Sequence, residues 1–217
     1  MRFALIPVKE LSQAKARLAP VLDDTGRREL ALALYRDVLA AALACPALDA
    51  VAVVSRDRDV LSLAGEAGAE ALPEPGGLNE ALASASQALA RRWRDADRLV
   101  VLAADLPLAT PDGIAAVSLA DADVALVSSA DGGTNALALP PATIAFRFGP
   151  DSARRHLAEA KKAGLRSLRL DLPSLALDID TPEDLFRLRD AIEDGEPIGL
   201  HTRRLYKQLH IMTQTAR

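Results

Sequence analysis

The stretch Leu99-Val-Val-Leu-Ala-Ala-Asp-Leu-Pro-Leu108 decides the fold that this sequence predicts. Its apolar run is too short for a soluble helix and is rich in β-branched residues, which indicates a strand buried on both faces, as in the centre of a parallel sheet. Pro107 cannot continue a strand ladder, so the strand ends near Asp105. Because ligands of open α/β sheets bind at the carboxyl ends of the strands, Asp105 is a candidate site residue.

Length, composition and charge restrict the class of protein. No shift in composition divides the 217 residues, and 50% of them are hydrophobic, so we expect one globular domain. A net charge of −4 gives no overall field that would attract nucleic acid or an anionic membrane, which favours a small-molecule substrate. The single cysteine rules out an intrachain disulfide, and we find no signal peptide or membrane-spanning run, so we expect a cytoplasmic protein.

Strand and helix patterns alternate along the chain. Besides the central strand, short apolar runs predict strands at residues 3–8, 51–55, 69–72, 124–127, 136–139, 168–170 and 175–179. Helical spacing and capping residues predict helices at residues 25–44, 57–67, 79–94, 110–119 and 181–193, with Asn79 as one of the caps, and a further helix after Ser152. This order indicates a single-domain α/β fold over residues 1–194, with a mostly parallel central sheet and helices on both faces. Residues 195–217 are interpreted as a basic C-terminal arm.

A basic loop follows the first predicted strand. Lys9, Lys15 and Arg17 would neutralise a polyphosphate placed at this end of the sheet, although an ordinary solvated loop has a similar composition. The chain contains neither the G-x-G-x-x-G nor the G-x-x-x-x-G-K-[ST] motif. Both common nucleotide-binding loops are therefore absent.

Two further aspartates end the last predicted strand. Alternation along a strand at 175–179 would point Asp178 and Asp180 to the same side. Together with Asp105 they would offer the oxygen ligands that Mg²⁺ prefers. Each also has a structural alternative, because Asp180 precedes a predicted helix and Asp178 can accept a hydrogen bond from a backbone amide.

Two loops of small and polar residues expose backbone N–H groups, at residues 128–135 and 148–152. The second loop opens a helix that carries Arg154, Arg155 and His156. The amino end of a helix attracts phosphate or carboxylate groups, and the arginines add positive charge. We interpret His156 as a structural residue.

In combination these motifs resemble the CofC-type guanylyltransferases over residues 2 to 192. The matching segments are Ile6-Pro-Val-Lys9, Ala14-Lys-Ala-Arg-Leu18, Leu78-Asn79, Ala103-Ala-Asp-Leu-Pro107, Asp131-Gly-Gly-Thr-Asn-Ala136, Phe148-Gly-Pro-Asp-Ser152 and Leu177-Asp-Ile-Asp-Thr-Pro-Glu-Asp184. The resemblance implies a three-layer, glycosyltransferase-A-like fold of the nucleotide-diphospho-sugar transferase type. It also implies transfer of GMP from GTP to a small phosphorylated acid, with release of pyrophosphate, in the biosynthesis of coenzyme F(420).

The resemblance and the chemistry together suggest a role for each candidate residue. The expected ligands of Mg²⁺ are Asp105, Asp178 and Asp180, and the expected catalytic residues are Lys15 and Asp105. The residues expected at GTP are Lys9, Lys15, Arg17 and Asn79, and those expected at the acceptor are Thr134, Gly149 and Ser152. An ionised acceptor phosphate needs no general base. The acceptors implied are phosphoenolpyruvate, 2-phospho-L-lactate and 3-phospho-D-glycerate, which the sequence does not distinguish.

The first loop departs from the glycine-rich loop of the related molybdenum-cofactor guanylyltransferases. We expect lysine and arginine side chains to replace its backbone N–H contacts. Two alternatives remain open, namely a transferase of the same fold acting on a molybdopterin or sugar phosphate, and a non-catalytic nucleotide-binding module. The expected partners are the small-molecule substrates and, transiently, the next enzyme of the pathway, with a homodimer as an open alternative.

Overall fold

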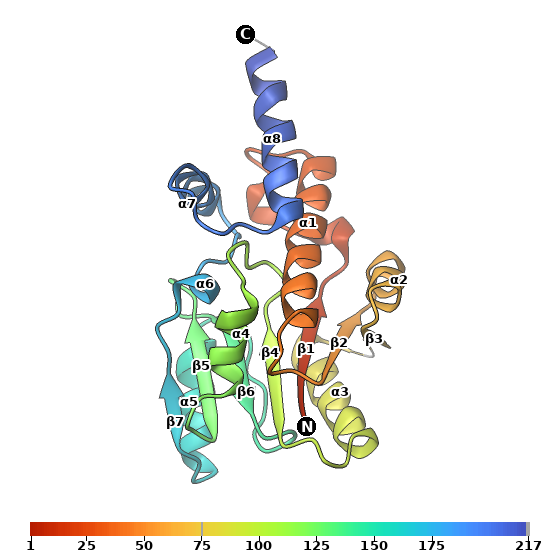
Figure 1. Cartoon of the computed structure of the whole chain (residues 1–217), viewed down its shortest axis with the longest axis vertical. Helices are drawn as coiled ribbons and strands as arrows, with labels where there is room; N and C mark the ends of the chain where they lie inside the picture. Colours follow the sequence, from red (N-terminus) through yellow and green to blue (C-terminus); the bar gives the residue numbers. More distant parts are fainter. Residues whose placement is uncertain (75, 216–217) are drawn as a thin grey trace.

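The computed structural model describes residues 1–74 and 76–215, which form three layers around a central sheet (Figure 1). The strands are β1 (Arg2–Val8), β2 (Ala50–Ser55), β3 (Glu70–Pro73), β4 (Arg98–Leu102), β5 (Val124–Ser128), β6 (Thr134–Leu139) and β7 (Ser167–Arg169). Their order in the sheet is β3-β2-β1-β4-β6-β5-β7. Strand β6 runs antiparallel to β4 and β5, and the other neighbouring pairs are parallel. The predicted α/β fold with a mostly parallel sheet is confirmed.

Helices cover both faces of the sheet, as predicted (Figure 1). They are α1 (Asp24–Leu43), α2 (Arg58–Glu66), α3 (Leu78–Arg92), α4 (Pro111–Ser118), α5 (Ser152–Lys162), α6 (Pro173–Ala176), α7 (Pro182–Glu193) and α8 (Leu200–Thr215). Two short 3₁₀ turns, η1 (Leu11–Gln13) and η2 (Ala16–Leu18), lie in the basic loop after β1. Helices α1, α2 and α4 pack on one face of the sheet, and α3 and α5 pack on the other.

Alternate residues of β1 build the two main cores. Ala4 and Ile6 belong to the cluster beneath α1, α2 and α4, whereas Phe3 and Leu5 belong to the cluster beneath α3 and α5. All four side chains are fully buried. Because β1 and its neighbour β4 have both faces covered, polar side chains gather beyond the carboxyl ends of these strands.

The strand predicted at residues 175–179 is wrong. Leu175 and Ala176 end the short helix α6, and the residues that follow are irregular backbone. The side chain of Asn135 donates hydrogen bonds to the carbonyl oxygens of Leu175 and Ala176, at 3.0 and 3.1 Å. These carbonyls are therefore satisfied by a side chain instead of a neighbouring strand.

The predicted helix cap at Asn79 is also wrong. Helix α3 begins at Leu78, and its cap is Gly77, whose backbone is extended. Asn79 lies inside the first turn of α3 and makes other contacts, described below.

Helix α8 packs on α1 near its own first turn. Ile198, Thr202 and Leu205 are buried, two of them in a third hydrophobic cluster with residues of α1 and α7. The carboxylate of Asp37 in α1 accepts hydrogen bonds from the backbone N–H groups of His201 and Thr202, at 2.9 and 2.8 Å. These bonds satisfy donors that the first turn of a helix leaves open. The start of the segment interpreted as an arm is thus anchored to the domain.

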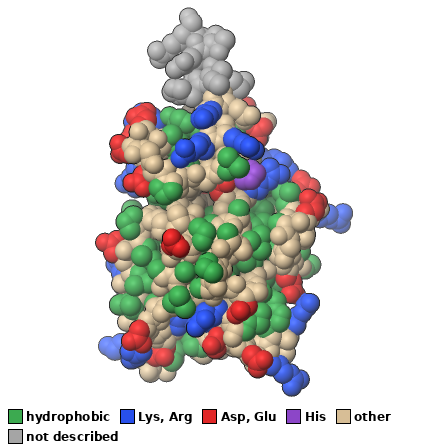
Figure 2. Space-filling model, viewed as in Figure 1, with side chains coloured by type: hydrophobic (Ala, Val, Ile, Leu, Met, Phe, Trp, Pro, Cys, Tyr) green, Lys and Arg blue, Asp and Glu red, His purple; other side chains and the backbone are tan. Residues whose placement is uncertain are grey.

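Basic side chains gather around the first half of α8 (Figure 2). Arg203, Arg204 and Lys207 lie in this part of the helix. No helix among the described residues combines the length and the apolar character needed to cross a membrane.

Candidate active site

A cavity of about 540 Å³ lies beyond the carboxyl ends of β1 and β4. The residues that line it include Pro7, Val8, Lys9, Leu11, Gln13, Ala14, Lys15, Ala16, Arg17, Ala31, Glu74, Leu78, Ala103, Ala104, Asp105, Thr134, Phe148 and Asp180. Because β6 runs antiparallel to β4, its first residue, Thr134, lies at this end of the sheet. The cavity occupies the place where open α/β sheets bind their ligands.

Lys15 is enclosed in this cavity between two carboxylates. Its Nζ lies 2.5 Å from Oδ2 of Asp105 and 3.1 Å from Oδ1 of Asp180, and its side chain is only 7% exposed. Burial lowers the pKa of Lys15, but the two carboxylates outweigh this effect and raise the pKa above its usual value. The ammonium group therefore stays charged at neutral pH. Lys15 also has a φ of 56°, a left-handed backbone conformation that is costly for a residue other than glycine.

Asp178 adds a third carboxylate to this group. Burial raises the pKa of Asp178 to about 6, and the negative charges of Asp105 and Asp180 contribute to the increase. The three aspartates, predicted from two segments of the chain, therefore lie close enough for their charges to interact. Asp178 does not line the cavity itself.

Asn135 holds the segment that carries Asp178. Its Nδ2 donates to the carbonyl oxygens of Leu175 and Ala176 and lies 3.5 Å from Oδ1 of Asp178. Asn135 had no role in the sequence analysis. The sequence analysis placed Asn135 in a loop, whereas it is the second residue of β6 and only 3% exposed, and a buried amide needs hydrogen-bond partners.

Lys9 and Arg17 provide positive charge on the wall of the cavity. Both side chains are exposed, and neither forms an ion pair within the described part of the chain. Arg17 contributes to lowering the pKa of Asp131, although the hydrogen bond from the hydroxyl of Ser129 has the larger effect. Unpaired cations next to a cavity are suited to an anionic ligand such as a polyphosphate.

The predicted acceptor residues meet at the amino end of α5. Ser152 Oγ donates to Thr134 Oγ1 at 2.9 Å, and both side chains are buried. Gly149 has a φ of 119°, which favours glycine, and a Cβ at this position would lie 3.3 Å from Nη2 of Arg155. The Nε of Arg155 is buried and has no partner among the described residues. Thr134 lines the cavity directly, whereas Gly149 follows Phe148, which lines it, and Ser152 bonds to Thr134.

Asn79 contacts the acceptor turn. Its Oδ1 accepts a hydrogen bond from the backbone N–H of Phe148 at 2.8 Å, and its Nδ2 donates to the carbonyl oxygen of Phe148 at 3.2 Å. Both ends of the amide are engaged by one residue. Leu78 and Phe148 line the cavity, whereas Asn79 does not, so its contacts position the turn before Gly149.

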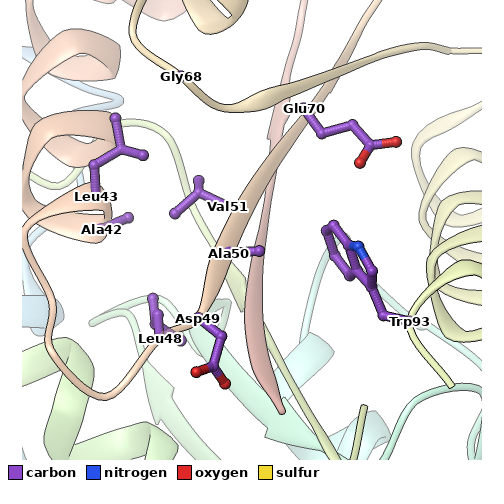
Figure 3. A pocket seen from close by; sticks show the side chains of 9 residues that line it. All are labelled: Ala42, Leu43, Leu48, Asp49, Ala50, Val51, Gly68, Glu70 and Trp93. Carbon is purple, nitrogen blue, oxygen red and sulfur yellow. The ribbon is translucent and has the colours of Figure 1, made fainter. Parts of the chain in front are cut away.

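A smaller cavity, of about 270 Å³, lies at the opposite end of the strands (Figure 3). Figure 3 shows Glu70 and Trp93 close to one another beside β2. The two carboxylates that line this smaller cavity already have partners. Glu70 pairs with Arg92 at 2.5 Å, and Asp49 accepts a hydrogen bond from the backbone N–H of Arg2 at 2.6 Å. No lysine or arginine is among its lining residues, so we place the chemistry in the larger cavity.

The aspartates match the oxygen ligands that Mg²⁺ prefers. Among the residues that the structure describes, no three carboxylate, imidazole or thiol groups are arranged as a metal site, and the ammonium group of Lys15 lies between Asp105 and Asp180. Mg²⁺ commonly takes one or two protein carboxylates and completes its shell with water and phosphate oxygens. Asp105 and Asp178, whose charges interact, offer such a pair.

Lys9, Arg17 and two of the aspartates, Asp105 and Asp180, line one cavity at the carboxyl ends of the strands. The family model and the curated relatives show that the chain is a nucleotidyltransferase. It belongs to the family of CofC-like guanylyl transferases, whose sequence model matches residues 1–215. The family assignment that the sequence motifs suggested is confirmed.

Two curated relatives illustrate the family. The chain is 45% identical to the phosphoenolpyruvate guanylyltransferase of Sphaerobacter thermophilus, with 85% of this chain and 91% of the relative covered. It is 38% identical to the 2-phospho-L-lactate guanylyltransferase of Methanothermobacter thermautotrophicus, with 99% and 93% covered. Relatives named for different acceptors therefore resemble this chain to a similar degree.

Solved structures confirm the fold. A Desulfovibrio desulfuricans G20 protein, proposed to be a nucleotide-diphospho-sugar transferase, superimposes with a TM-score of 0.77 at 18% identity, covering 98% of this chain and 97% of the other. A nucleotidyl transferase from Methanothermobacter gives a TM-score of 0.64 at 18% identity, covering 90% and 99%. The predicted fold type is thus confirmed.

Proposed function

We propose that this protein transfers the guanylyl group of GTP to the phosphate of a small phosphorylated carboxylic acid, releasing pyrophosphate, as a step of coenzyme F(420) biosynthesis. The names of the relatives support a guanylyl group as the group transferred and a small phosphorylated acid as the acceptor. The observation that carries the proposal is the enclosure of Lys15 by Asp105 and Asp180, in a cavity that Thr134 also lines.

The proposed reaction brings two anions together. An oxygen of the acceptor phosphate attacks the α-phosphorus of GTP, and the bond between that phosphorus and the oxygen bridging to the β-phosphate breaks. Pyrophosphate leaves with the bonding electrons. No proton has to be removed, because the attacking oxygen is already ionised. The protein therefore has to neutralise charge and align the reactants.

The basic residues are assigned to GTP. Lys9 and Arg17 lie on the cavity wall without ion-pair partners in the described chain, so they are available to the triphosphate. Lys15 is held in place by the carboxylates, which makes it suited to the charge that develops on the leaving pyrophosphate. Asn79, also predicted at GTP, contacts Phe148 in the turn before α5, so its contacts support the acceptor side instead.

The acceptor is assigned to the turn before α5. Thr134 offers a hydroxyl to the cavity, Ser152 bonds to that hydroxyl, and Gly149 leaves room beside Arg155. A cationic guanidinium group with an unpartnered Nε supports the binding of an anion here. Phosphoenolpyruvate, 2-phospho-L-lactate and 3-phospho-D-glycerate all carry the phosphate and carboxylate groups that this turn suits.

Mg²⁺ is the proposed cofactor. Of the three predicted ligands, Asp105 and Asp178 would hold it, and Asp180 would stay paired with Lys15. When bound, it would offset negative charge on the phosphate oxygens of both substrates. Lys15 keeps two of these carboxylates in position before the substrates arrive.

Pyrophosphate release tests this proposal. Purified protein with Mg²⁺ and GTP is assayed with phosphoenolpyruvate, 2-phospho-L-lactate and 3-phospho-D-glycerate in parallel, with ATP and CTP as donor controls. We expect release with GTP and at least one of the acids. Absence of release with all three acids, from protein that binds GTP, would reject the proposed acceptors and favour a sister transferase. A trapping step with the next pathway enzyme identifies a labile product.

A further inference from the structure

We infer that His156 is a positioning residue for the acceptor, and that it directs the hydroxyl proton of Thr134 into the cavity. The inference rests on the proposed function, since the acceptor is the ligand concerned. It assigns to His156 a role that the sequence analysis did not foresee.

The side chain of His156 is fully buried. It lies in the first half of α5, and its ring meets the ring of Phe148 edge to face at a centroid distance of 4.8 Å. Burial, together with the positive charges of Arg155 and Arg147, lowers the pKa of His156 to about 4 against the opposing effect of Glu159. The ring is therefore neutral at pH 7 and carries a single N–H proton.

The position of that proton follows from the partner of the other nitrogen. His156 Nε2 lies 2.9 Å from the backbone nitrogen of Arg147. A backbone N–H can only donate, so Nε2 must accept and cannot itself be protonated. The proton is therefore on Nδ1, which lies 3.1 Å from Oγ1 of Thr134. His156 donates to Thr134.

Thr134 then has no acceptor capacity left for the protein. Its oxygen has two lone pairs, and it receives one hydrogen bond from His156 Nδ1 and one from Ser152 Oγ at 2.9 Å. The hydroxyl proton must point in a third direction. Because Thr134 lines the cavity, this proton is available to an acceptor in the cavity.

A hydroxyl fixed as a donor favours an anion. A threonine whose hydroxyl could rotate freely would offer either a proton or a lone pair, and a lone pair would repel a carboxylate or phosphate oxygen. The hydrogen bonds from His156 and Ser152 occupy the lone pairs of Thr134, so the hydroxyl can offer only its proton. The acceptor site is thus selective for an anionic oxygen in place of a neutral donor, without any charge on Thr134 itself.

Nuclear magnetic resonance of the ring nitrogens tests the first step without substrate. The chain has three histidines, and the signals of His156 are identified by their loss in His156→Asn. We expect a proton on Nδ1 and none on Nε2 in the wild type. A proton on Nε2 would overturn the inference. This measurement keeps the inference separate from the proposed function, which fails if the wild type uses none of the three acids.

Two amide variants test the second step, because each keeps a different hydrogen bond. The amide nitrogen of His156→Asn can replace Nδ1 and still donate to Thr134. His156→Gln can replace Nε2 and still accept from Arg147, but it loses the bond to Thr134. We expect His156→Gln to raise the KM of the acceptor about tenfold, the scale of one hydrogen bond, with the KM of GTP unchanged. His156→Asn should stay within about threefold of the wild type.

A larger increase in the KM of the acceptor in His156→Asn than in His156→Gln would overturn the inference. That result is expected of a purely structural histidine, whose important hydrogen bond is the one from the backbone N–H of Arg147. The variants are compared again in Thr134→Val, where no hydroxyl remains to be directed and His156→Gln should add less than about twofold. A full tenfold effect in that background would also overturn the inference. Leu157→Ala is the control for stability, since Leu157 lies on the same helix and packs against the same core.

Discussion

The Nζ of Lys15 lies 2.5 Å from Oδ2 of Asp105, although 90 positions separate the two residues in the sequence. Lys15 comes from the loop after β1, and Asp105 follows β4, the parallel neighbour of β1. Their ion pair joins the two strand ends at the edge where substrates are expected. With Asp180 as its second partner, Lys15 also balances charge that would otherwise repel a polyphosphate.

Replacement of Lys15 tests this role. Lys15→Gln should lower kcat for pyrophosphate release by about 10²- to 10³-fold, because a buried and oriented charge at the reacting phosphates is lost. It should also lower the Tm, since the neighbouring aspartates lose their counter-charge. Lys9→Gln is the comparison, because Lys9 is exposed and its loss should raise the KM of GTP by only about twofold to fivefold. Equal effects of the two variants on kcat would contradict the special role of Lys15.

Removal of divalent cations should stop the reaction without unfolding the protein. Lys15 forms ion pairs with both Asp105 and Asp180, so the chain itself holds these two carboxylates together. With EDTA we expect pyrophosphate release to fall by at least about 10²-fold and to return when Mg²⁺ is added. The Tm should change by less than about 4 °C, which corresponds to about 1 kcal/mol in a chain of this size. A rate that is insensitive to EDTA would reject Mg²⁺ as the cofactor.

Asp178 should make the protein less stable as the pH rises. The pKa of its carboxyl is raised from 3.8 to about 6, so between these values the folded state binds more protons than the unfolded state. Its contribution to stability is present below pH 3.8 and is lost as the pH rises through 6. Asp178→Asn should therefore have a higher Tm than the wild type at pH 7.5, with the difference disappearing near pH 4, while its turnover falls. A difference that does not depend on pH would contradict this account.

The wild type has to be compared with Asp178→Asn at each pH, because the titration of His156 changes the stability with pH in the opposite direction. The pKa of His156 is lowered from 6.5 to about 4, so in this range the unfolded state binds more protons and stability rises with pH. The two effects oppose one another between pH 4 and 6 in the wild type. Subtracting the Tm of the wild type from that of the variant at each pH isolates Asp178.

The local part of this structure was predictable, and the part that depends on distant contacts was not. Continuous apolar runs are sufficient to place β1 and β4, and Pro107 is sufficient to place Asp105 at a strand end. The irregular segment at residues 175–179 depends instead on Asn135, which lies 40 positions before Leu175. No periodicity in the segment itself records that contact.

The candidate site shows the same division. The types of residue needed for an anionic substrate were visible in Lys15 and Asp105, because charge and position at a strand end are properties of the sequence. The tautomer of His156 was not visible, since it depends on the backbone of Arg147 meeting Nε2 and on Thr134 meeting Nδ1. The role of Asn79 was likewise hidden in its contacts with a turn far along the chain.

Asp37 provides a test of how α8 is attached. Its carboxylate satisfies two N–H groups in the first turn of α8, and it is buried. Asp37→Ala should lower the free energy of unfolding by about 1–3 kcal/mol, because those donors lose their partners. The KM values should not change, since Asp37 does not line the cavity. Denaturant unfolding and steady-state kinetics measure the two quantities.

Asp24→Ala is the matched control, because Asp24 lies in the same helix with a side chain that is 94% exposed, and its removal should change stability by less than about 0.5 kcal/mol. Gly199→Ala should act like Asp37→Ala, since an added Cβ would overlap the Asp37 carboxylate and displace it from the start of α8. The backbone N–H of Gly199 also donates to the carbonyl oxygen of Pro107 at 3.1 Å, two residues after Asp105. If Gly199→Ala lowered kcat while Asp37→Ala did not, that bond would be the one that couples α8 to the active site.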